Sequence, residues 1–153
     1  MPQDFDEAFK ELEQSIMKDM REIFSEKTIE RFLNPRNLGR IEAADGFGRV
    51  TGGCGDTMEI YLKVSNDKIL NASFWTDGCG ASIASGSAVT ELAKGKSIAE
   101  VGKITQTDVL DVLDGLPEEN RHCALLAANT VKEAIKDYFN SKNEPWKRAY
   151  RTH

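Results

Sequence analysis

The stretch from residue 57 to residue 76 restricts the fold more than any other part of the chain, because its pattern predicts a β-hairpin. In TMEIYLKV, apolar residues alternate with more polar ones, which is typical of a half-buried strand. SNDK then supplies turn-forming residues, and the segment Ile69–Thr76 predicts the return strand. We expect residues 48–53 to add a third strand at one edge of this sheet.

Helical patterns lie on both sides of the hairpin. Apolar residues recur at steps of three and four from Phe5 to Ile23, which predicts an amphipathic helix with a charged outer face. Ser25 can cap a second, short helix, and Asn34 ends it because a residue before proline is pushed out of helical geometry. After the hairpin the chain predicts a small-residue helix ending at Gly95, two short helices capped by Ser97 and Thr105, and a long helix from near Pro117 to about Asn140. This pattern predicts an α+β fold, a small three-stranded antiparallel sheet with helices packed on one face.

The composition favours one domain that works in a reducing compartment. The chain has 153 residues, of which 40% are hydrophobic, enough for a single core. A net charge of -5 argues against a nucleic-acid surface, which needs basic residues to neutralise phosphates. No apolar run approaches the roughly 20 residues that span a bilayer, and no signal-peptide pattern is visible, so we expect a cytoplasmic protein without membrane partners. Three cysteines, an odd number, fit reduced thiols better than a disulfide framework.

Each cysteine lies at a junction between predicted elements, where loops gather functional groups. Cys54 precedes a strand in the loop GGCGD, Cys79 separates a strand from a helix in TDGCGAS, and Cys123 falls in the first turn of the last helix. We expect the three thiols to meet in a metal site at one end of the fold, with Asp56 and His122 as nearby oxygen and nitrogen donors. A set dominated by sulfur favours zinc or iron-sulfur chemistry over magnesium or calcium.

Glycines flank two of these cysteines, and we expect them to serve the site by allowing positive φ and a close approach of backbone N–H groups to a cluster. They are Gly53, Gly55, Gly78 and Gly80, and Asp77 is a further carboxylate nearby. Predicted helix N-termini near Cys79 and Cys123 should lower the pKa of both thiols. The residues alone leave ordinary roles open, since a buried cysteine is often a small hydrophobe and a lone aspartate is often a turn residue.

Several segments together resemble one known family. CGDTMEIYLKV, TDGCGASIASGSAVTELAKGKS and HCALLAANTVKEAIKDY are similar, in order and spacing, to the cysteine-bearing segments of the IscU/NifU-type iron-sulfur cluster assembly scaffolds. SEKTIERFLNPRNLG resembles the N-terminal segment of that family. The resemblance divides the chain into an N-terminal amphipathic helical extension (residues 1–24), a scaffold domain (residues 25–140) and a basic C-terminal tail (residues 141–153).

The resemblance implies a scaffold and carrier rather than an enzyme. Such a protein assembles a [2Fe-2S] cluster from iron and from sulfur delivered by a cysteine desulfurase, and passes the cluster to apo iron-sulfur recipient proteins. By this similarity Cys54, Cys79 and Cys123 are cluster ligands and sulfur acceptors, Asp56 tunes cluster lability, and His122 is a candidate ligand. Zinc can occupy the same ligands in a purified sample.

One motif departs from the family. Bacterial IscU members carry Leu-Pro-Pro-Val-Lys before His-Cys, a motif read by an Hsp70-type chaperone, whereas this chain has LPEEN at residues 116–120. The resemblance therefore does not extend to chaperone-driven release. The helix of residues 3–24 lies outside the resemblance, and we expect it either to pack on the domain or to form a homo-oligomer.

Three other functions compete with this interpretation. SufU-like sulfur acceptors hold zinc through three cysteines and an aspartate, but they carry a longer insertion and usually lack the histidine, whereas here Cys79 and Cys123 are 44 positions apart and His122 is present. A hydrolase or acyl transferase would use Cys79 as nucleophile and His122 as base. A module with a purely structural zinc would leave the glycine flanks unexplained.

Overall fold

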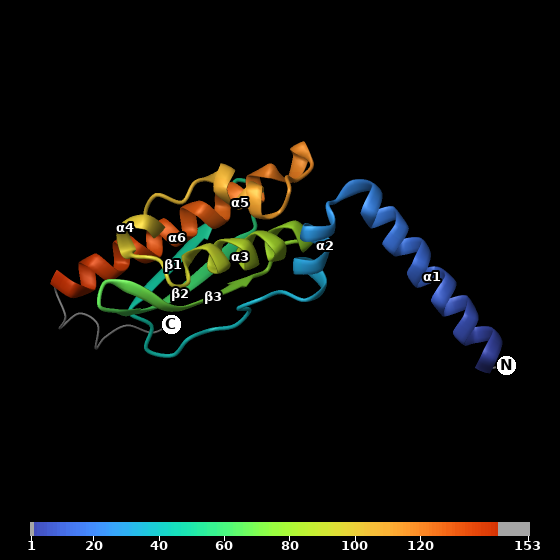
Figure 1. Ribbon diagram of the computed structural model, residues 1–153, viewed down its shortest axis with the longest axis horizontal. Coiled ribbons are helices and arrows are strands. Elements are labelled where there is room, and N and C mark those ends of the chain that lie inside the picture. The colour runs from blue at the N-terminus through green and yellow to red at the C-terminus, as the bar shows by residue number, and fades with distance from the viewer. Residues whose placement is uncertain (1, 144–153) are drawn as a thin grey trace.

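The computed structural model describes residues 2–143, which form one small sheet and a series of helices (Figure 1). In chain order the elements are α1 (Pro2–Ile23), α2 (Glu26–Leu33), β1 (Gly46–Thr51), β2 (Thr57–Ser65), β3 (Lys68–Thr76), α3 (Gly80–Ala93), α4 (Ile98–Val101), α5 (Gln106–Val112), a 3₁₀ turn at Glu118–Asn120 and α6 (Arg121–Asn143). Within these residues no helix combines the length and the apolar character that crossing a bilayer requires.

The three strands form an antiparallel sheet in the order β1-β2-β3, as the sequence predicts. Asn66 and Asp67 make the hairpin turn with φ of 53° and 61°, the left-handed conformation that a two-residue turn requires. Strand β1, which the sequence predicted as an additional edge strand, begins at Gly46 rather than at residue 48. A side chain at Gly48 would place Cβ 2.4 Å from the Thr130 carbonyl oxygen, so this glycine lets α6 cross β1 closely.

Helices α3 and α6 lie on one face of the sheet, α5 packs against both of them, and the main core lies between the sheet and these helices (Figure 1). This confirms the predicted α+β fold. The small residues of α3 allow close packing on β3: a Cβ at Gly86 would lie 2.3 Å from the ring of Phe74. Fully buried core side chains include Met58, Ile60, Leu62, Phe74, Val89 and Val131.

The opposite face of β2 is also buried, where the alternating pattern predicts a half-buried strand. Tyr61 and Glu59 are almost inaccessible there, and the Tyr61 hydroxyl donates to Glu59 Oε1 at 2.7 Å. Arg40 and Arg49 reach the same carboxylate at 3.4 and 3.3 Å. Burial, and then the hydrogen bond and charge of Glu59, raise the pKa of Tyr61 to about 12. Charged residues from the α2–β1 connector and from β1 thus compensate a buried carboxylate.

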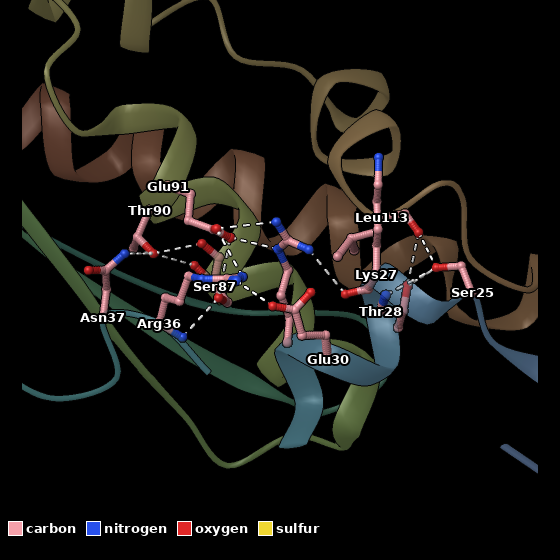
Figure 2. A network of polar contacts seen from close by, with 12 residues as sticks. Ser25, Lys27, Thr28, Glu30, Arg36, Asn37, Ser87, Thr90, Glu91 and Leu113 are labelled. Atoms are coloured by element: carbon pink, nitrogen blue, oxygen red, sulfur yellow. Dashed lines mark hydrogen bonds and ion pairs between the residues drawn. The ribbon is translucent and has the colours of Figure 1, made fainter. Parts of the chain in front are cut away.

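Helix α2 is fastened to the domain by polar contacts (Figure 2). Ser25 caps its first turn as predicted, because its hydroxyl oxygen accepts a hydrogen bond from Thr28 N at 3.1 Å. The side-chain hydroxyls of Ser25 and Thr28 both donate to the carbonyl oxygen of Leu113, at the end of α5. Farther along, Arg31 binds both carboxylate oxygens of Glu91 in α3, at 2.7 and 3.2 Å. This bidentate, largely buried pair holds α2 against α3.

Helix α1, in contrast, projects away from the domain (Figure 1). Five large apolar side chains on it are half exposed or more: Phe5, Phe9, Leu12, Ile16 and Ile23. The amphipathic helix of the sequence prediction is therefore present, and the structure leaves its apolar stripe uncovered.

The last helix differs from the prediction at its start. It begins at Arg121 rather than near Pro117, because Glu118–Asn120 form a separate 3₁₀ turn. It continues to Asn143, so residues 141–143 of the predicted tail are helical, and residues 144–153 lie outside the described part of the chain.

Candidate metal centre

Three junctions meet at one end of the sheet because of the strand register. Thr51 pairs with Thr57, and Met58 pairs with Thr76, so the end of β1, the start of β2 and the end of β3 lie at the same end of the sheet. The loop after β1 carries Cys54 and Asp56, and β3 leads directly into α3, with Cys79 as the N-cap residue. The first turn of α6 brings Cys123 to the same end.

Backbone hydrogen bonds hold these junctions in place. Gly52 N donates to the Asp56 carbonyl oxygen at 2.8 Å, which closes the loop after β1. Asp77 Oδ1 accepts from Thr57 N at 2.8 Å, and Thr76 Oγ1 donates to the Thr57 carbonyl oxygen at 2.7 Å. Asp77 therefore fastens the β3–α3 junction to β2, and its carboxylate does not join the metal-ligand group described next.

Asp56, Cys79 and Cys123 form a compact group that we call the inner set. One carboxylate oxygen and the two Sγ atoms all lie within 4.8 Å of one another, which fits a single metal ion. Asp56 is half-buried, Cys79 is exposed and Cys123 is fully buried. Two sulfurs and one oxygen suit zinc or iron better than magnesium or calcium, which take oxygen ligands.

Cys54 and His122 lie outside this group, and we call them the outer pair. Both are exposed, and both line a surface hollow of about 530 Å³ with Thr51, Leu125 and Asn129. His122 Nε2 is 3.6 Å from Cys123 Sγ, so the outer pair adjoins the inner set. The structure thus gathers the five predicted residues at one end of the fold, but places only three of them within reach of one ion.

The predicted low pKa is wrong for Cys123. Burial raises the pKa of this thiol to about 11, and the nearby Cys79 and Asp56 contribute in the same direction. The hydrogen bond from Ser82 acts in the opposite direction but does not compensate. Burial therefore raises the pKa of Cys123 more than its position in the first turn of a helix lowers it. A metal that binds the Cys123 thiolate must displace the proton of the thiol.

The glycines serve the site differently from the prediction. Of the four that flank the cysteines, only Gly55 has a positive φ, at 93°. Gly78 instead makes room, since a Cβ there would lie 2.7 Å from Asp56 Oδ2 and 2.6 Å from Ser82 Oγ. Gly53 faces open space, because a Cβ at this position would have no neighbouring atom within 4 Å. Close packing of the inner set, more than unusual backbone geometry, accounts for Gly78.

Ser82 is a residue of this centre that the sequence analysis missed. It lies in the first turn of α3, has no exposed surface, and its hydroxyl is 3.1 Å from Asp56 Oδ2 and 3.3 Å from Cys123 Sγ. The available signal is its spacing, because residues three positions apart on a helix share a face. Ser82 therefore follows Cys79 toward the centre.

Comparisons of the sequence agree with the predicted family. The family described as NifU-like N terminal domain matches residues 23–145. The iron-sulfur cluster assembly scaffold protein IscU 1 of Archaeoglobus fulgidus is 47% identical over 123 residues, covering 80% of this chain and 80% of that protein. The iron-sulfur cluster assembly scaffold protein IscU of Escherichia coli is 44% identical over 126 residues, covering 79% of this chain and 97% of that protein.

Solved structures share the fold. A nitrogen-fixing NifU-like protein (N-terminal) from Brucella abortus aligns with a TM-score of 0.61 and 20% identity, over 76% of this chain and 94% of the other. A putative iron-sulfur cluster assembly scaffold protein for the SUF system from Fervidobacterium islandicum aligns with a TM-score of 0.61 and 22% identity, over 73% and 96%. These likenesses establish the architecture.

Proposed function

This chain belongs to the NifU-like N terminal domain family, and from that premise we propose that it is a scaffold for iron-sulfur cluster assembly. In this proposal a [2Fe-2S] cluster is built on the chain from iron and desulfurase-derived sulfur, which an external electron donor helps to reduce from persulfide to sulfide, and the cluster is then passed to apo-proteins. The cluster is cargo, so the chain acts as a carrier and not as an enzyme. The scaffold names of relatives at 44 to 47% identity support this function.

The observation that carries the proposal is the combination of a compact inner set with an exposed outer pair. In our proposal Asp56, Cys79 and Cys123 capture the first iron, and Cys54 extends the site to the second, with His122 as a further candidate ligand. A site open to solvent on one side suits a protein that must give its cluster away. An electron carrier would instead enclose the cluster to protect it and set its potential.

The three cysteines differ in solvent exposure, and we propose that this difference decides which of them accept sulfur. We propose that Cys54 and Cys79, both exposed, receive sulfur from the persulfide of a cysteine desulfurase. Cys123 is buried and holds its proton tightly, so it is a poor first acceptor and serves as a ligand. Beside Cys79 lies an apolar hollow of about 280 Å³, lined by Met20, Phe24 and Phe32, which offers the desulfurase a docking surface.

Chaperone-driven release is not part of the proposal. The residues that replace the family's chaperone motif include Glu118 and Glu119, which lie in an exposed 3₁₀ turn. Glu118 and Glu119 replace the uncharged Pro-Val pair of the family motif, and Asn120 replaces the lysine that follows that pair. Since this segment lacks the basic residue of the motif, we propose that recipient proteins take the cluster directly. The free cysteines agree with a reducing compartment, and we propose the cytoplasm.

We propose in addition that α1 mediates self-association. Phe5, Phe9, Leu12 and Ile16 follow the three-and-four spacing of a coiled-coil seam, and Ile23 lies one heptad after Ile16, so a second copy of the helix can match this stripe. The helix carries seven acidic and three basic residues, so repulsion opposes pairing and salt should strengthen it. Light scattering after size exclusion at low and high salt tests this, and a monomer under both conditions would contradict it.

Zinc-dependent sulfur relay is the second candidate, because the inner set alone offers thiolate and carboxylate donors that suit zinc. The hydrolase alternative has little support, since the contact of His122 is with Cys123 rather than with the proposed nucleophile Cys79.

Anaerobic reconstitution separates the first two functions. The protein is mixed with ferrous iron, cysteine and a cysteine desulfurase, and iron, sulfide and zinc are measured before transfer to an apo-ferredoxin. A labile cluster that moves to the ferredoxin supports the scaffold. Tight zinc with persulfide on a cysteine and no cluster would instead support sulfur relay.

A further inference from the structure

Ser82 occupies a position that its own helix does not explain. Two other buried hydroxyls on α3 donate their proton within their own helix: Ser85 donates to the Ala81 carbonyl oxygen at 2.7 Å, and Thr90 donates to the Gly86 carbonyl oxygen at 2.9 Å. Both hydrogen bonds of the Ser82 side chain instead leave the helix, to Asp56 and to Cys123. These two residues come from different elements, so Ser82 connects separate parts of the inner set.

The local packing is built around this contact. Ser82 has no exposed surface, and Gly78 lacks the Cβ that would lie 2.6 Å from the Ser82 hydroxyl oxygen. Water therefore does not compete for the hydroxyl, and a hydrogen bond to an ionised carboxylate or thiolate is strong in such a place. The hydroxyl has one proton, which it gives to one partner at a time, while its lone pairs accept from the other when that partner is protonated.

We propose that Ser82 is a positioning residue of the metal centre that links Asp56 to Cys123, an inference that rests on the proposed function of the same site. In the metal-free protein Ser82 donates to the Asp56 carboxylate and fixes its orientation toward Cys79 and Cys123. The same hydroxyl lies 3.3 Å from Cys123 Sγ, within reach of a hydrogen bond to the sulfur. Through these two contacts Ser82 holds the oxygen ligand and the sulfur ligand at a fixed separation.

Two measurable consequences follow from this arrangement. Outer partners of metal ligands orient them, so loss of the Ser82 hydroxyl should weaken binding of a single metal ion. Hydrogen bonds to cluster sulfur stabilise the reduced state, so the same loss should make the reduction potential of a bound cluster more negative. A hydroxyl that serves only helix packing would produce neither change.

The test compares Ser82→Ala with Ser85→Ala, a matched serine that is equally buried on the same helix but bonds to its own backbone. Titration with Co²⁺, followed by its visible absorption, should show about tenfold weaker binding for Ser82→Ala, within the range for outer-shell losses. Ser85→Ala should bind Co²⁺ like the unchanged protein. Equal affinities for the two variants would overturn the inference.

A second pair of measurements guards against a general loss of folding. Ser82→Thr keeps the hydroxyl and should restore most of the Co²⁺ affinity lost in Ser82→Ala. In an Asp56→Ala background, Ser82→Ala should cost less affinity than it does alone, because one of its partners is already absent. Full additivity, or a Thr variant that folds but binds as weakly as Ala, would overturn the link between Ser82 and the ligands.

Cluster measurements keep this inference distinct from the proposed function. On reconstituted protein, the potential should shift to more negative values in Ser82→Ala and stay unchanged in Ser85→Ala. If the unchanged protein assembles no cluster, the scaffold proposal fails while the Co²⁺ comparison still decides the role of Ser82. If clusters form and both variants keep the same potential, the scaffold proposal stands and the inference about Ser82 fails.

Discussion

The inner set and the outer pair differ in how firmly the fold holds them. Asp56, Cys79 and Cys123 come from three parts of the chain, and their ligand atoms lie within 4.8 Å of one another before any metal is considered. Cys54 and His122 are exposed and line an open hollow. In such a centre the inner set, whose ligand atoms are already close together, can select the metal, and the exposed outer pair can allow the cluster to enter and leave.

The largest expected effect comes from removing a ligand of the inner set. Cys123→Ala should abolish both single-metal binding and cluster formation, with a loss of Co²⁺ affinity beyond the roughly 100-fold seen for outer-shell changes. Co²⁺ titration and iron and sulfide analysis measure the two losses. A Cys123→Ala protein that still binds Co²⁺ tightly would break the division between the two groups.

A matched pair of glycine changes tests whether packing, as well as ligand identity, maintains the inner set. Gly78→Ala places a methyl group against Asp56 and Ser82, whereas Gly53→Ala places one in open space beside Cys54. We expect Gly78→Ala to weaken Co²⁺ binding by about tenfold or more and Gly53→Ala to leave it unchanged. Similar Co²⁺ affinities for both variants would show that the inner set is not prepared by the fold.

Asp56→Ala should act in opposite directions on a single ion and on a cluster. The inner set loses one of its three donors, so Co²⁺ binding weakens. The family resemblance implies that this aspartate promotes release, so a reconstituted cluster should persist severalfold longer and transfer to apo-ferredoxin more slowly. Decay of visible absorption in air and transfer kinetics measure this, and a shorter-lived cluster would contradict the assigned role.

The smallest effect on the centre is expected from the far face of the sheet. Because the pKa of Tyr61 is about 12 in the folded protein and near 10 in the unfolded chain, its contribution to stability is complete below pH 10 and is lost as pH rises through 12. Tyr61→Phe should lower the free energy of unfolding at pH 8 by about 1 to 3 kcal/mol, since it leaves Glu59 without this donor.

The same variant should also lose less stability than the unchanged protein between pH 10 and pH 12. Urea unfolding at a series of pH values measures both differences. Co²⁺ affinity at pH 8 should be unaffected, because the Tyr61 hydroxyl bonds to Glu59 and not to the inner set. An altered affinity would show that the centre responds to changes across the sheet.

Local signals in the sequence predicted most of the fold. The strand β2, the Asn66-Asp67 turn and the helix caps at Ser25, Ser97 and Thr105 are each determined by a few neighbouring residues, and the structure confirms them, although most of β2 is buried on both faces. The register of the sheet then explains why the junctions that carry the cysteines meet at one end. Order along the chain was therefore enough to predict a common site.

The sequence did not predict which residues of the site are buried or how their side chains pack. Cys123 lies at a helix N-terminus, but its raised pKa depends on how completely its surroundings enclose it. Gly78 resembles a flexible loop glycine, yet its function is to clear space for the side chains of Asp56 and Ser82. Cys54 lies two residues from Asp56, and nothing in that spacing reveals that it stays outside the inner set. The ligand roles themselves remain predictions.

Replacement of the outer cysteine tests the central claim most directly. The account predicts that Cys54→Ala keeps Co²⁺ affinity close to that of the unchanged protein, because the inner set is intact, yet yields no stable cluster after anaerobic reconstitution. Co²⁺ titration with iron and sulfide analysis of one preparation gives both results. A Cys54→Ala protein that holds a full, stable [2Fe-2S] cluster would contradict the account.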